Sequence, residues 1–367
     1  MRWVVAVAVA SCACSFDHGA AQTDSGTKDG STRDVPNGPW LPGYMRRKPI
    51  TLTPPISSAL TDFPVGIIEP ADAQLAQSAR EDGRDLVFTA GDGTTPLDHE
   101  LVRFNGTSGA LEAWVRIPVL PATPTTIYLY YQGTERPSAG AATWSSKFAG
   151  VWHLGTATTD STAHNHPAAA QNASKTPNLV DGIAGNARDF DGNDDTLLVA
   201  DPSDGSLDFG ISSFSMSLWV KVSQSNGMFD APIGKGGSTT TDPGYCMLFG
   251  QDNWQIKIHD GVSYRDPVVG TETLNEWVHI AAVLDRTAQQ YLGYRDGAFA
   301  SMEPTTGVGS ISSAQPLVLG VIDQTAFRGS LDEVRIYNGT LAPDWIEAEH
   351  ANLATSTFVA IGTEQTP

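Results

Sequence analysis

Two adjacent acids, Asp332 and Glu333, are the first residues of this sequence to suggest a chemical role. They lie in SLDEVRI (330–336), a segment that alternates like a β-strand, whose successive side chains point to opposite faces. Alternation places Asp332 on the apolar face of Val334 and Ile336. Because a carboxylate on an apolar face needs a cation, a metal or hydrogen-bond donors, Asp332 is a candidate ligand or a buried acceptor.

The same strand bears on catalysis. Two carboxylates on one face are the least that acid–base or nucleophilic attack on a glycosidic bond requires. Of the positions that share the face of Asp332, the others are Ser330 and two aliphatic residues, so a single one is acidic. The sequence also contains no G-x-S-x-G, no H-E-x-x-H and no Gly-rich phosphate loop. A glycan-cleaving enzyme is therefore an alternative that the sequence disfavours.

A pair of histidines offers a different chemistry. His164 and His166 are two residues apart in DSTAHNHP, a loop segment where zinc binding is one interpretation. No cysteine or third histidine lies near them in sequence. Solvent-exposed loop histidines are the alternative, and the sequence favours it.

The segment GQDNWQIKIHDGVSYRD supplies the candidate ligand-binding residues. Sugar-binding sandwiches use an aromatic face to stack on a pyranose ring, and polar side chains to contact its hydroxyls. Trp254, Tyr264 and Arg265 offer this combination. Since Trp254 has the strand parity of Ile256 and Ile258, a core position is the alternative for its ring.

Short alternating strands must position these residues, and six of them fall between about 40 and 136. Together they predict a small β-sandwich. Trp114 faces outward from its strand, and a large outward aromatic predicts an interface with the second block. The six segments are KPITLT (48–53), DFPVGII (62–68), DLVFTA (85–90), LDHELVRF (97–104), LEAWVRIPVL (111–120) and TTIYLYYQG (125–133). This block resembles an uncharacterised bacterial surface-domain family through WLPGYMRRKPI, DFPV, REDGRDLVFT, LDHEL, AWVRIP and IYLYY, which implies an envelope location and a sandwich-like fold.

A second block, 145–362, follows the connection ERPSAGAATW, whose Pro, Gly, Ala and Ser indicate a boundary between independently folding parts. It carries FAGVWHLG, DSTAHNH, DGIAGNARDFDGNDD, FSMSLWVKV, EWVHIAAVLD, YRDGAFA and FRGSLDEVRIYNGTL in order. These resemble the landmarks of the laminin-G-like, concanavalin A-like jelly roll. APDWIEAEHAN predicts a short helix after them, and STFVAIGT predicts a strand that closes this block.

The resemblance to concanavalin A-like sandwiches implies a metal. Several of these families hold a structural calcium that joins the early strand and loop to the last core strand. On this sequence the implied ligands are Asp332, on the last core strand, and Asp160, in the early loop. Calcium takes carboxylate and backbone carbonyl oxygens. The alternative is that Asp332 accepts hydrogen bonds from loop amides or pairs with an arginine.

The N-terminal segment MRWVVAVAVASC indicates the compartment. Its apolar run is too short to span a bilayer as a helix and is typical of a signal peptide. VASC resembles the lipobox of bacterial lipoproteins, in which the cysteine is lipidated, so the resemblance implies a signal peptide at 1–11 and lipidation of Cys12. Cys14 is a second candidate, and an ordinary signal peptide is the alternative. Ala13 after the lipobox favours the outer membrane.

Composition fits this assignment. Residues 12–39 contain few aliphatic side chains after Cys12, which predicts a disordered tether. The 367 residues carry a net charge of −19, which disfavours binding to nucleic acid. Of the three cysteines, Cys246 alone lies in the predicted blocks, and a buried hydrophobic role is expected for it.

The sequence thus predicts an all-β protein of two tandem β-sandwiches, the C-terminal one a concanavalin A-like jelly roll. It predicts an envelope lipoprotein, lipid-anchored to the outer membrane, with a non-catalytic role in binding carbohydrate or a surface protein. A structural or adhesion spacer without a small ligand is the alternative. Calcium is the one cofactor that the resemblance implies.

Overall fold

The computed structural model describes residues 38–138, 140–225, 229–237, 241–250, 252–322 and 325–367. The predicted signal peptide, the lipidation at Cys12 and the predicted tether up to residue 37 lie outside these ranges. Among the helices within them, none combines the length and apolar character that crossing a membrane requires.

The N-terminal block contains all six predicted strands, which form two antiparallel sheets. One sheet has the order β24-β1-β6-β3, in which β24 (Val359–Ile361) comes from the end of the chain, and the other has the order β2-β5-β4. A short helix that no sequence pattern predicted begins after Asp72, whose carboxylate accepts hydrogen bonds from the backbone N–H groups of Gln74 and Leu75. The elements are β1 (Tyr44–Leu52), β2 (Leu60–Glu69), α1 (Ala73–Ser78), β3 (Val87–Thr89), β4 (His99–Asn105), β5 (Ala110–Leu120) and β6 (Thr125–Gly133).

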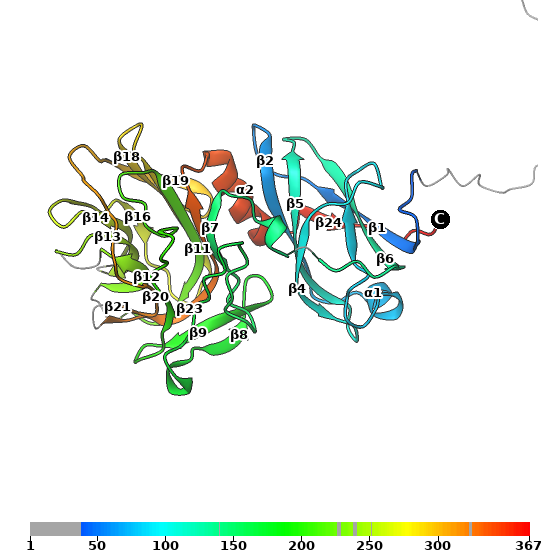
Figure 1. Ribbon diagram of the computed structural model, residues 1–367, viewed down its shortest axis with the longest axis horizontal. Helices are drawn as coiled ribbons and strands as arrows, with labels where there is room; N and C mark the ends of the chain where they lie inside the picture. Colours follow the sequence, from blue (N-terminus) through cyan, green and yellow to red (C-terminus); the bar gives the residue numbers. More distant parts are fainter. Residues whose placement is uncertain (1–37, 139, 226–228, 238–240, 251, 323–324) are drawn as a thin grey trace, which may run out of the picture. The chain divides into compact units, whose positions relative to one another are not determined.

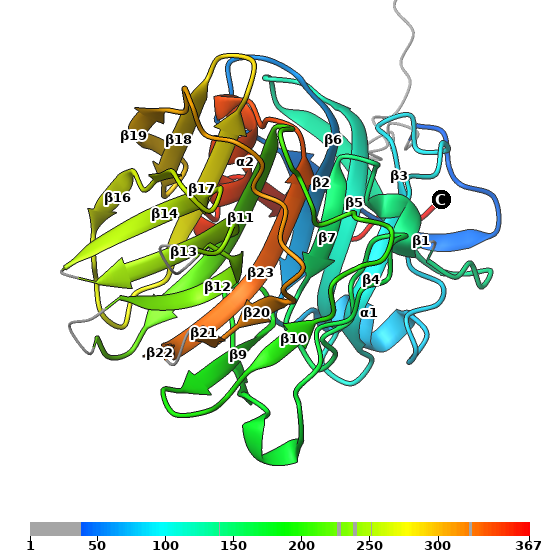
Figure 2. The ribbon, with the colours of Figure 1, turned by 60° about the vertical axis from the view of Figure 1, so that its left-hand side comes forward.

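The C-terminal block is a second, larger sandwich (Figure 2). Its first sheet has the order β10-β20-β12-β13-β14-β15, with β16 paired to β14; its second has the order β19-β18-β17-β11-β23-β9-β8, with β7 paired to β23. From residue 140 to the end of the chain, the elements are η1 (Gly140–Thr143), β7 (Phe148–Trp152), η2 (Ala173–Lys175), β8 (Asn178–Asp181), β9 (Asn186–Asp191), β10 (Leu197–Val199), β11 (Phe214–Val222), β12 (Asp230–Gly236), β13 (Gly244–Gly250), β14 (Asn253–His259), β15 (Tyr264–Arg265), β16 (Val268–Thr271), β17 (Val278–Asp285), β18 (Gln290–Arg295), β19 (Ala298–Pro304), β20 (Leu317–Leu319), β21 (Val321–Ile322), β22 (Thr325–Ala326), β23 (Arg328–Asn338), α2 (Pro343–Ala354) and β24 (Val359–Ile361), the last of which belongs to the first block.

The predicted C-terminal helix is present as α2, but the strand after it does not close the second sandwich. β24 pairs with β1 of the first sandwich, with Ile361 opposite Ile50. The pairing continues beyond the strand, because Gly362 donates its N–H to the carbonyl of Pro49. The chain therefore returns to the first block after α2, so that its last strand belongs to the N-terminal sandwich.

The two sandwiches share a hydrophobic core. The outer face of the sheet that contains β11, β17 and β23 packs against α2 and against β2-β5-β4, and Figure 1 shows α2 and β7 between the two blocks. One continuous apolar cluster includes Phe63 and Trp114 from the first block, and Phe148, Tyr337 and Trp345 from the second. From residue 38 on, the described chain clusters as one compact unit. Independent folding of the second block, which the connecting segment suggested, stays a prediction, and this shared packing weighs against it.

Trp114 lies at this interface, as its outward position predicted. Its side chain is buried, and the Arg335 guanidinium carbon lies 4.2 Å from the centre of its indole ring. Gly66 on the neighbouring strand leaves room for that ring, since a Cβ there would lie 2.9 Å from the indole. The Asn352 amide on α2 bonds both the N–H and the carbonyl of Gly66, at 2.7 and 3.0 Å. The contact thus gives the strand and the helix a fixed register.

The predicted strand face of Asp332 was wrong. The ladder between β11 and β23 shifts register within this segment, and Glu333 has a positive φ of 48°. Leu331, Val334 and Ile336 all belong to the core of the second sandwich. Because the irregularity inserts an extra residue between Leu331 and Val334, Asp332 lies on the opposite face from the aliphatic side chains that follow it.

Candidate functional site

The surface candidate for ligand binding lies at β14 and β15, on the sheet that faces away from the first sandwich. Along β14, Trp254, Ile256 and Ile258 belong to the core, so the intervening positions point outward. Tyr264 on β15 lies opposite His259 in the antiparallel register and therefore shares this outer face. Strand alternation thus separates the segment into a core face and a surface face.

Trp254 takes the core position that its parity indicated. Its side chain is 1% exposed, and its ring lies 5.0 Å from that of Phe249. It is therefore not available to stack on an external ligand, and the aromatic character of this surface rests on Tyr264.

Tyr264 is the exposed aromatic side chain of this segment. It is 49% exposed, and the Lys257 ammonium lies 5.4 Å from the centre of its ring. The His259 ring is nearly parallel to the tyrosine ring, with centroids 6.1 Å apart. A cation and a second ring beside the phenol restrict its orientation without covering it.

Arg265, the neighbour of Tyr264 on β15, anchors this strand. Its guanidinium donates hydrogen bonds to the backbone carbonyls of Pro304 and Thr306, at the end of β19 and just beyond it. The side chain thereby joins β15 to the other sheet of the sandwich. This arrangement gives Arg265 a positioning role beside the tyrosine.

An open hollow adjoins these side chains. It is lined by Tyr264, Arg265, Asp266, Glu303 and Pro304, together with Val262 and Ser263. Burial, assisted by the negative charge of Asp266, raises the pKa of Glu303 above its ordinary value. The hollow therefore combines an aromatic ring with carboxyl oxygens and hydroxyl groups, the side-chain types that contact sugar rings and their hydroxyls.

Asp332, the first candidate calcium ligand, accepts hydrogen bonds from backbone amides. Its Oδ2 accepts the N–H groups of Ile183 and Ala184 at 2.8 and 3.0 Å, and its Oδ1 accepts that of Glu333 at 2.9 Å. Burial, followed by the charge of Glu333, raises its pKa well above the ordinary value. These contacts match the alternative to a calcium site, in which Asp332 accepts hydrogen bonds from loop amides.

Asp160, the second candidate, organises its own loop. Its Oδ1 accepts the N–H groups of Val151 and Thr162 at 3.0 and 2.9 Å. Its Oδ2 accepts the Thr162 hydroxyl at 2.9 Å and the N–H of His166 at 3.0 Å. The calcium site stays a prediction, and the donors around both carboxylates favour a structural role for each.

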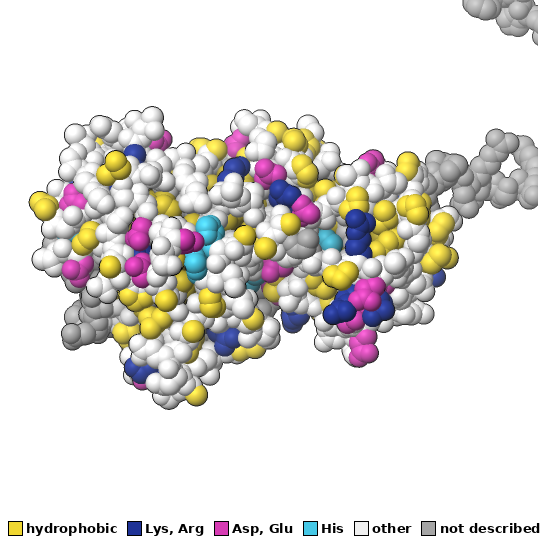
Figure 3. Space-filling model, viewed as in Figure 1, with side chains coloured by type: hydrophobic (Ala, Val, Ile, Leu, Met, Phe, Trp, Pro, Cys, Tyr) yellow, Lys and Arg dark blue, Asp and Glu magenta, His cyan; other side chains and the backbone are white. Residues whose placement is uncertain are grey.

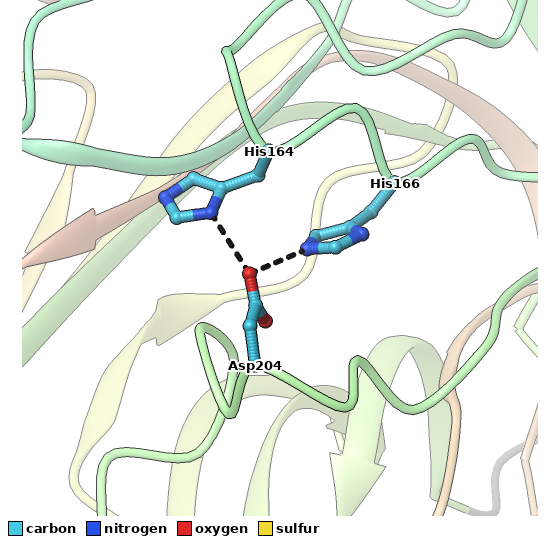
Figure 4. Close-up of side chains that lie close together, drawn as sticks. All are labelled: His164, His166 and Asp204. Carbon is cyan, nitrogen blue, oxygen red and sulfur yellow. Dashed lines mark hydrogen bonds and ion pairs between the residues drawn. The ribbon is translucent and has the colours of Figure 1, made fainter.

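The structure adds a partner that the sequence did not indicate for the two loop histidines. Asp204, 40 residues after His164, brings its Oδ2 to 3.2 Å from the Nδ1 of that histidine (Figure 4). The same oxygen lies 3.5 Å from the Nε2 of His166. No local sequence pattern connects these residues, because they meet only when the two loops pack side by side.

Comparison with known proteins supports the fold of the C-terminal sandwich. Residues 191–347 match the family model described as the concanavalin A-like lectin/glucanases superfamily. The C-terminal sandwich therefore has a concanavalin A-like fold. No curated protein matches the sequence.

Solved structures also resemble the chain. The binding domain of Paraclostridial Mosquitocidal Protein 1 matches with a TM-score of 0.48 and 16% identity, over 56% of this chain and 52% of that one. The botulinum neurotoxin serotype D binding domain matches with a TM-score of 0.46 and 14% identity, over 58% and 52%. Domain 4 of AbnA, a GH43 extracellular arabinanase from Geobacillus stearothermophilus, in complex with arabinotriose, matches with a TM-score of 0.44 and 21% identity, over 57% and 98%. The alignment spans about half the length of the first two chains.

Proposed function

We propose that this protein is a non-catalytic binding protein whose C-terminal sandwich recognises carbohydrate at the hollow beside Tyr264. The observation that carries the proposal is the half-exposed Tyr264 ring next to a hollow lined by Asp266 and Glu303. An exposed aromatic ring can stack on the apolar face of a sugar, while neighbouring carboxyl groups accept hydrogen bonds from its hydroxyls. The lectin and glucanase description of the matching family is consistent with this ligand class.

We propose a non-catalytic function because the two adjacent acids of β23 are buried. Asp332 and Glu333 are both almost fully buried. Asp332 accepts backbone amides, and Glu333 pairs with His153 and Arg335 at 2.7 and 2.8 Å. Neither carboxylate is free to act on a glycosidic bond. Since this strand was the one that could have supplied catalytic acids, their burial supports binding over hydrolysis.

We place this binding function at the cell envelope. The proposal rests on the lipobox-like VASC, which makes Cys12 the lipid-modified residue, and on the polar segment that separates it from the first sandwich. In this arrangement a tether holds the two sandwiches clear of the outer membrane, where they meet extracellular or envelope polysaccharide.

A glycan array, followed by calorimetry on the glycans that bind, tests the proposal. The protein carries Cys12→Ser so that it can be handled without lipid. Tyr264→Ala is expected to weaken glycan binding by about tenfold or more. Removing an aromatic stacking partner costs a nucleobase about 1–3 kcal/mol, and we expect a stacked sugar ring to lose a comparable amount. Phe299→Ala is the matched control, since Phe299 is also an exposed aromatic side chain of this sandwich but does not line the hollow.

The array result separates the proposal from its rivals. Equal glycan affinity in wild type and Tyr264→Ala overturns the assignment of the site. A silent array combined with capture of an envelope protein supports surface-protein recognition instead. The continuous core between the sandwiches favours the spacer as a second candidate, because it holds the two blocks as one stiff unit. The spacer would bind neither kind of ligand.

A further inference from the structure

Two loops of the C-terminal sandwich bring three metal-binding side chains together. His164 and His166 lie in the loop between β7 and η2, and Asp204 lies in the loop between β10 and β11. Their ligand atoms, one from each residue, all lie within 4.8 Å of one another (Figure 4). Among the residues that the structure describes, this is the cluster of three such side chains close enough to share one ion.

The two spacings between the carboxylate and the imidazoles fit a small metal ion. Metal–nitrogen and metal–oxygen bonds of a tetrahedral zinc site are about 2.0–2.1 Å, so adjacent ligand atoms stand about 3.3 Å apart. The Asp204 Oδ2 lies 3.2 Å from the His164 Nδ1 and 3.5 Å from the His166 Nε2. The carboxylate is thus already at ligand spacing from both imidazoles.

The backbone holds the histidine loop in this geometry. Buried Asp160 accepts the N–H of His166, and the indole N–H of Trp152 donates to the carbonyl of the same histidine at 2.9 Å. The N–H of His164 donates to the Thr162 hydroxyl at 3.2 Å. Because the loop is fixed from the core side, both imidazoles are positioned without a bound ion.

The carboxylate is positioned independently and is accessible. Asp204 accepts a hydrogen bond from the N–H of Ser206 at 3.0 Å through its Oδ1, the oxygen that does not face the histidines. The side chains of His164, His166 and Asp204 are 34%, 20% and 48% exposed. Histidine side chains lie at the surface beside acidic ones on the face shown in Figure 3. An ion could therefore enter from solvent and keep water in its remaining positions.

We propose that His164, His166 and Asp204 form a binding site for a divalent transition-metal ion, of which zinc is the representative. Two imidazole nitrogens and one carboxylate are ligands of such ions, whereas calcium prefers oxygen ligands throughout. Three protein ligands leave a fourth position open to water or to a ligand of the protein. The site shares no residue with the hollow beside Tyr264, and it differs from the calcium pair that the sequence implied.

Titration of the metal-free chain with zinc chloride in a calorimeter tests the proposal. The wild type is expected to bind about one zinc ion per chain at this site. His164→Gln, His166→Gln and Asp204→Asn are each expected to weaken binding by about tenfold or more, since even outer partners of metal ligands contribute about 10–100-fold. His350→Gln is the matched control, because it removes an imidazole that lies outside the cluster.

Cobalt substitution gives a second readout. Co²⁺ added to the wild type is expected to give visible absorption bands of a site with nitrogen and oxygen ligands, and zinc should displace them. Failure of the wild type to bind zinc overturns the proposal, as does binding that the three substitutions leave unchanged. Since all three side chains lie at the surface, equal thermal midpoints of the apo proteins show that a lost signal is not a lost fold.

Discussion

At the scale of single residues, Asp332 shows how one backbone irregularity changes a prediction. Strand alternation was the right rule for most of β23, but the positive φ at Glu333 inserts an extra residue into the ladder. The local sequence carries no Gly or Pro at this point to mark the change. Pairing with β11 and contact with the 183–184 loop decide the face of Asp332, and these are tertiary effects.

Asp332→Ala is expected to destabilise the fold without changing any response to calcium. The substitution leaves the backbone N–H groups of Ile183 and Ala184 without their acceptor, and each buried unpaired donor costs about 1–3 kcal/mol. Asp332→Asn keeps one carbonyl acceptor and should lose less. The measurement is chemical denaturation of all three proteins in excess calcium and in chelator.

The calcium hypothesis makes the opposite prediction. If calcium is bound, the wild-type midpoint falls in chelator, and the Asp332→Ala midpoint does not respond. We expect wild-type midpoints that coincide in the two buffers, because backbone N–H groups already face both Asp332 oxygens.

The candidate sites show which residue-scale features a sequence contains. Tyr264 and Arg265 lie on one short strand, and the parity of Trp254 correctly indicated its core position. Local patterns were therefore sufficient to place these three residues in the fold, whereas ligand contact at Tyr264 and Arg265 stays a prediction. Asp204 joins His164 across 40 residues through the packing of two loops, so no periodicity or spacing could have indicated the cluster.

At the scale of elements, buried charges connect strands of both sandwiches. His153, which follows β7, places its Nδ1 2.7 Å from Glu333 on β23 and its Nε2 3.3 Å from Glu100 on β4. Arg335 on β23 pairs with Glu333 at 2.8 Å and with Glu349 on α2 at 3.4 Å. Removing one member of such a network leaves an uncompensated buried charge, which is strongly destabilising.

The acidic neighbours determine the ionisation of His153. Burial alone would lower its pKa, but the carboxylates of Glu333 and Glu100 raise it to about 10. Glu112 on β5 also lies near His153. Burial, followed by the charge of Glu333, raises the pKa of Glu112 to about 7. The imidazole is therefore a cation at neutral pH, held between carboxylates of two sheets from different sandwiches.

A stability profile against pH tests this role of His153. Its pKa is about 6.5 when unfolded and about 10 when folded, so the cation stabilises the fold fully below pH 6.5. That stabilisation is lost as the pH rises through about 10. The wild type should therefore have a higher free energy of unfolding than His153→Gln. This difference should be largest near pH 6–7 and should shrink toward pH 10.

His350→Gln is the control for this profile. Burial, followed by the charge of His279, lowers the pKa of His350 to about 4, so this histidine is neutral over the whole window. Its substitution should shift stability by the same amount at every pH above neutrality. A wild-type advantage over His153→Gln that stays constant from pH 7 to 10 would show that His153 is not a buried cation.

At the scale of the whole molecule, the sequence predicted the parts better than their assembly. Alternation predicted β1 to β6 of the first sandwich, and ordered landmarks predicted the fold of the second. The pairing of β24 with β1 was not predictable, because a strand of three residues contains no information about which of two sheets it joins. Outward aromatic residues such as Trp114 did indicate the interface, but not that it would be a continuous core.

This shared core gives the two sandwiches a common stability. The outer face of the large C-terminal sheet buries Ala281, Val283 and Tyr294 in the same apolar cluster as Val65 and Ile67 of the first block. In a C-terminal fragment that begins at residue 145, these side chains would lose their cover from β2-β5-β4. The fragment would also retain β24 without β1, the strand with which it pairs.

We therefore expect the fragment 145–367 to be much less stable than the intact protein, or to aggregate. Each large apolar side chain that becomes exposed forfeits about 1.5–3 kcal/mol of burial, which is a substantial part of the stability of a domain. The intact chain should unfold in one cooperative transition in urea, monitored by tryptophan fluorescence and by circular dichroism.

The matched control for the fragment is the full chain cut at a protease site engineered into the 134–138 connection. In this nicked protein both pieces are present and the core remains covered. That nicked protein should keep most of the original stability, and adding a separate 38–136 fragment should rescue 145–367. If 145–367 alone unfolds with the midpoint of the intact chain, the interface contributes nothing to folding, and the connecting segment marks a true boundary between independent domains.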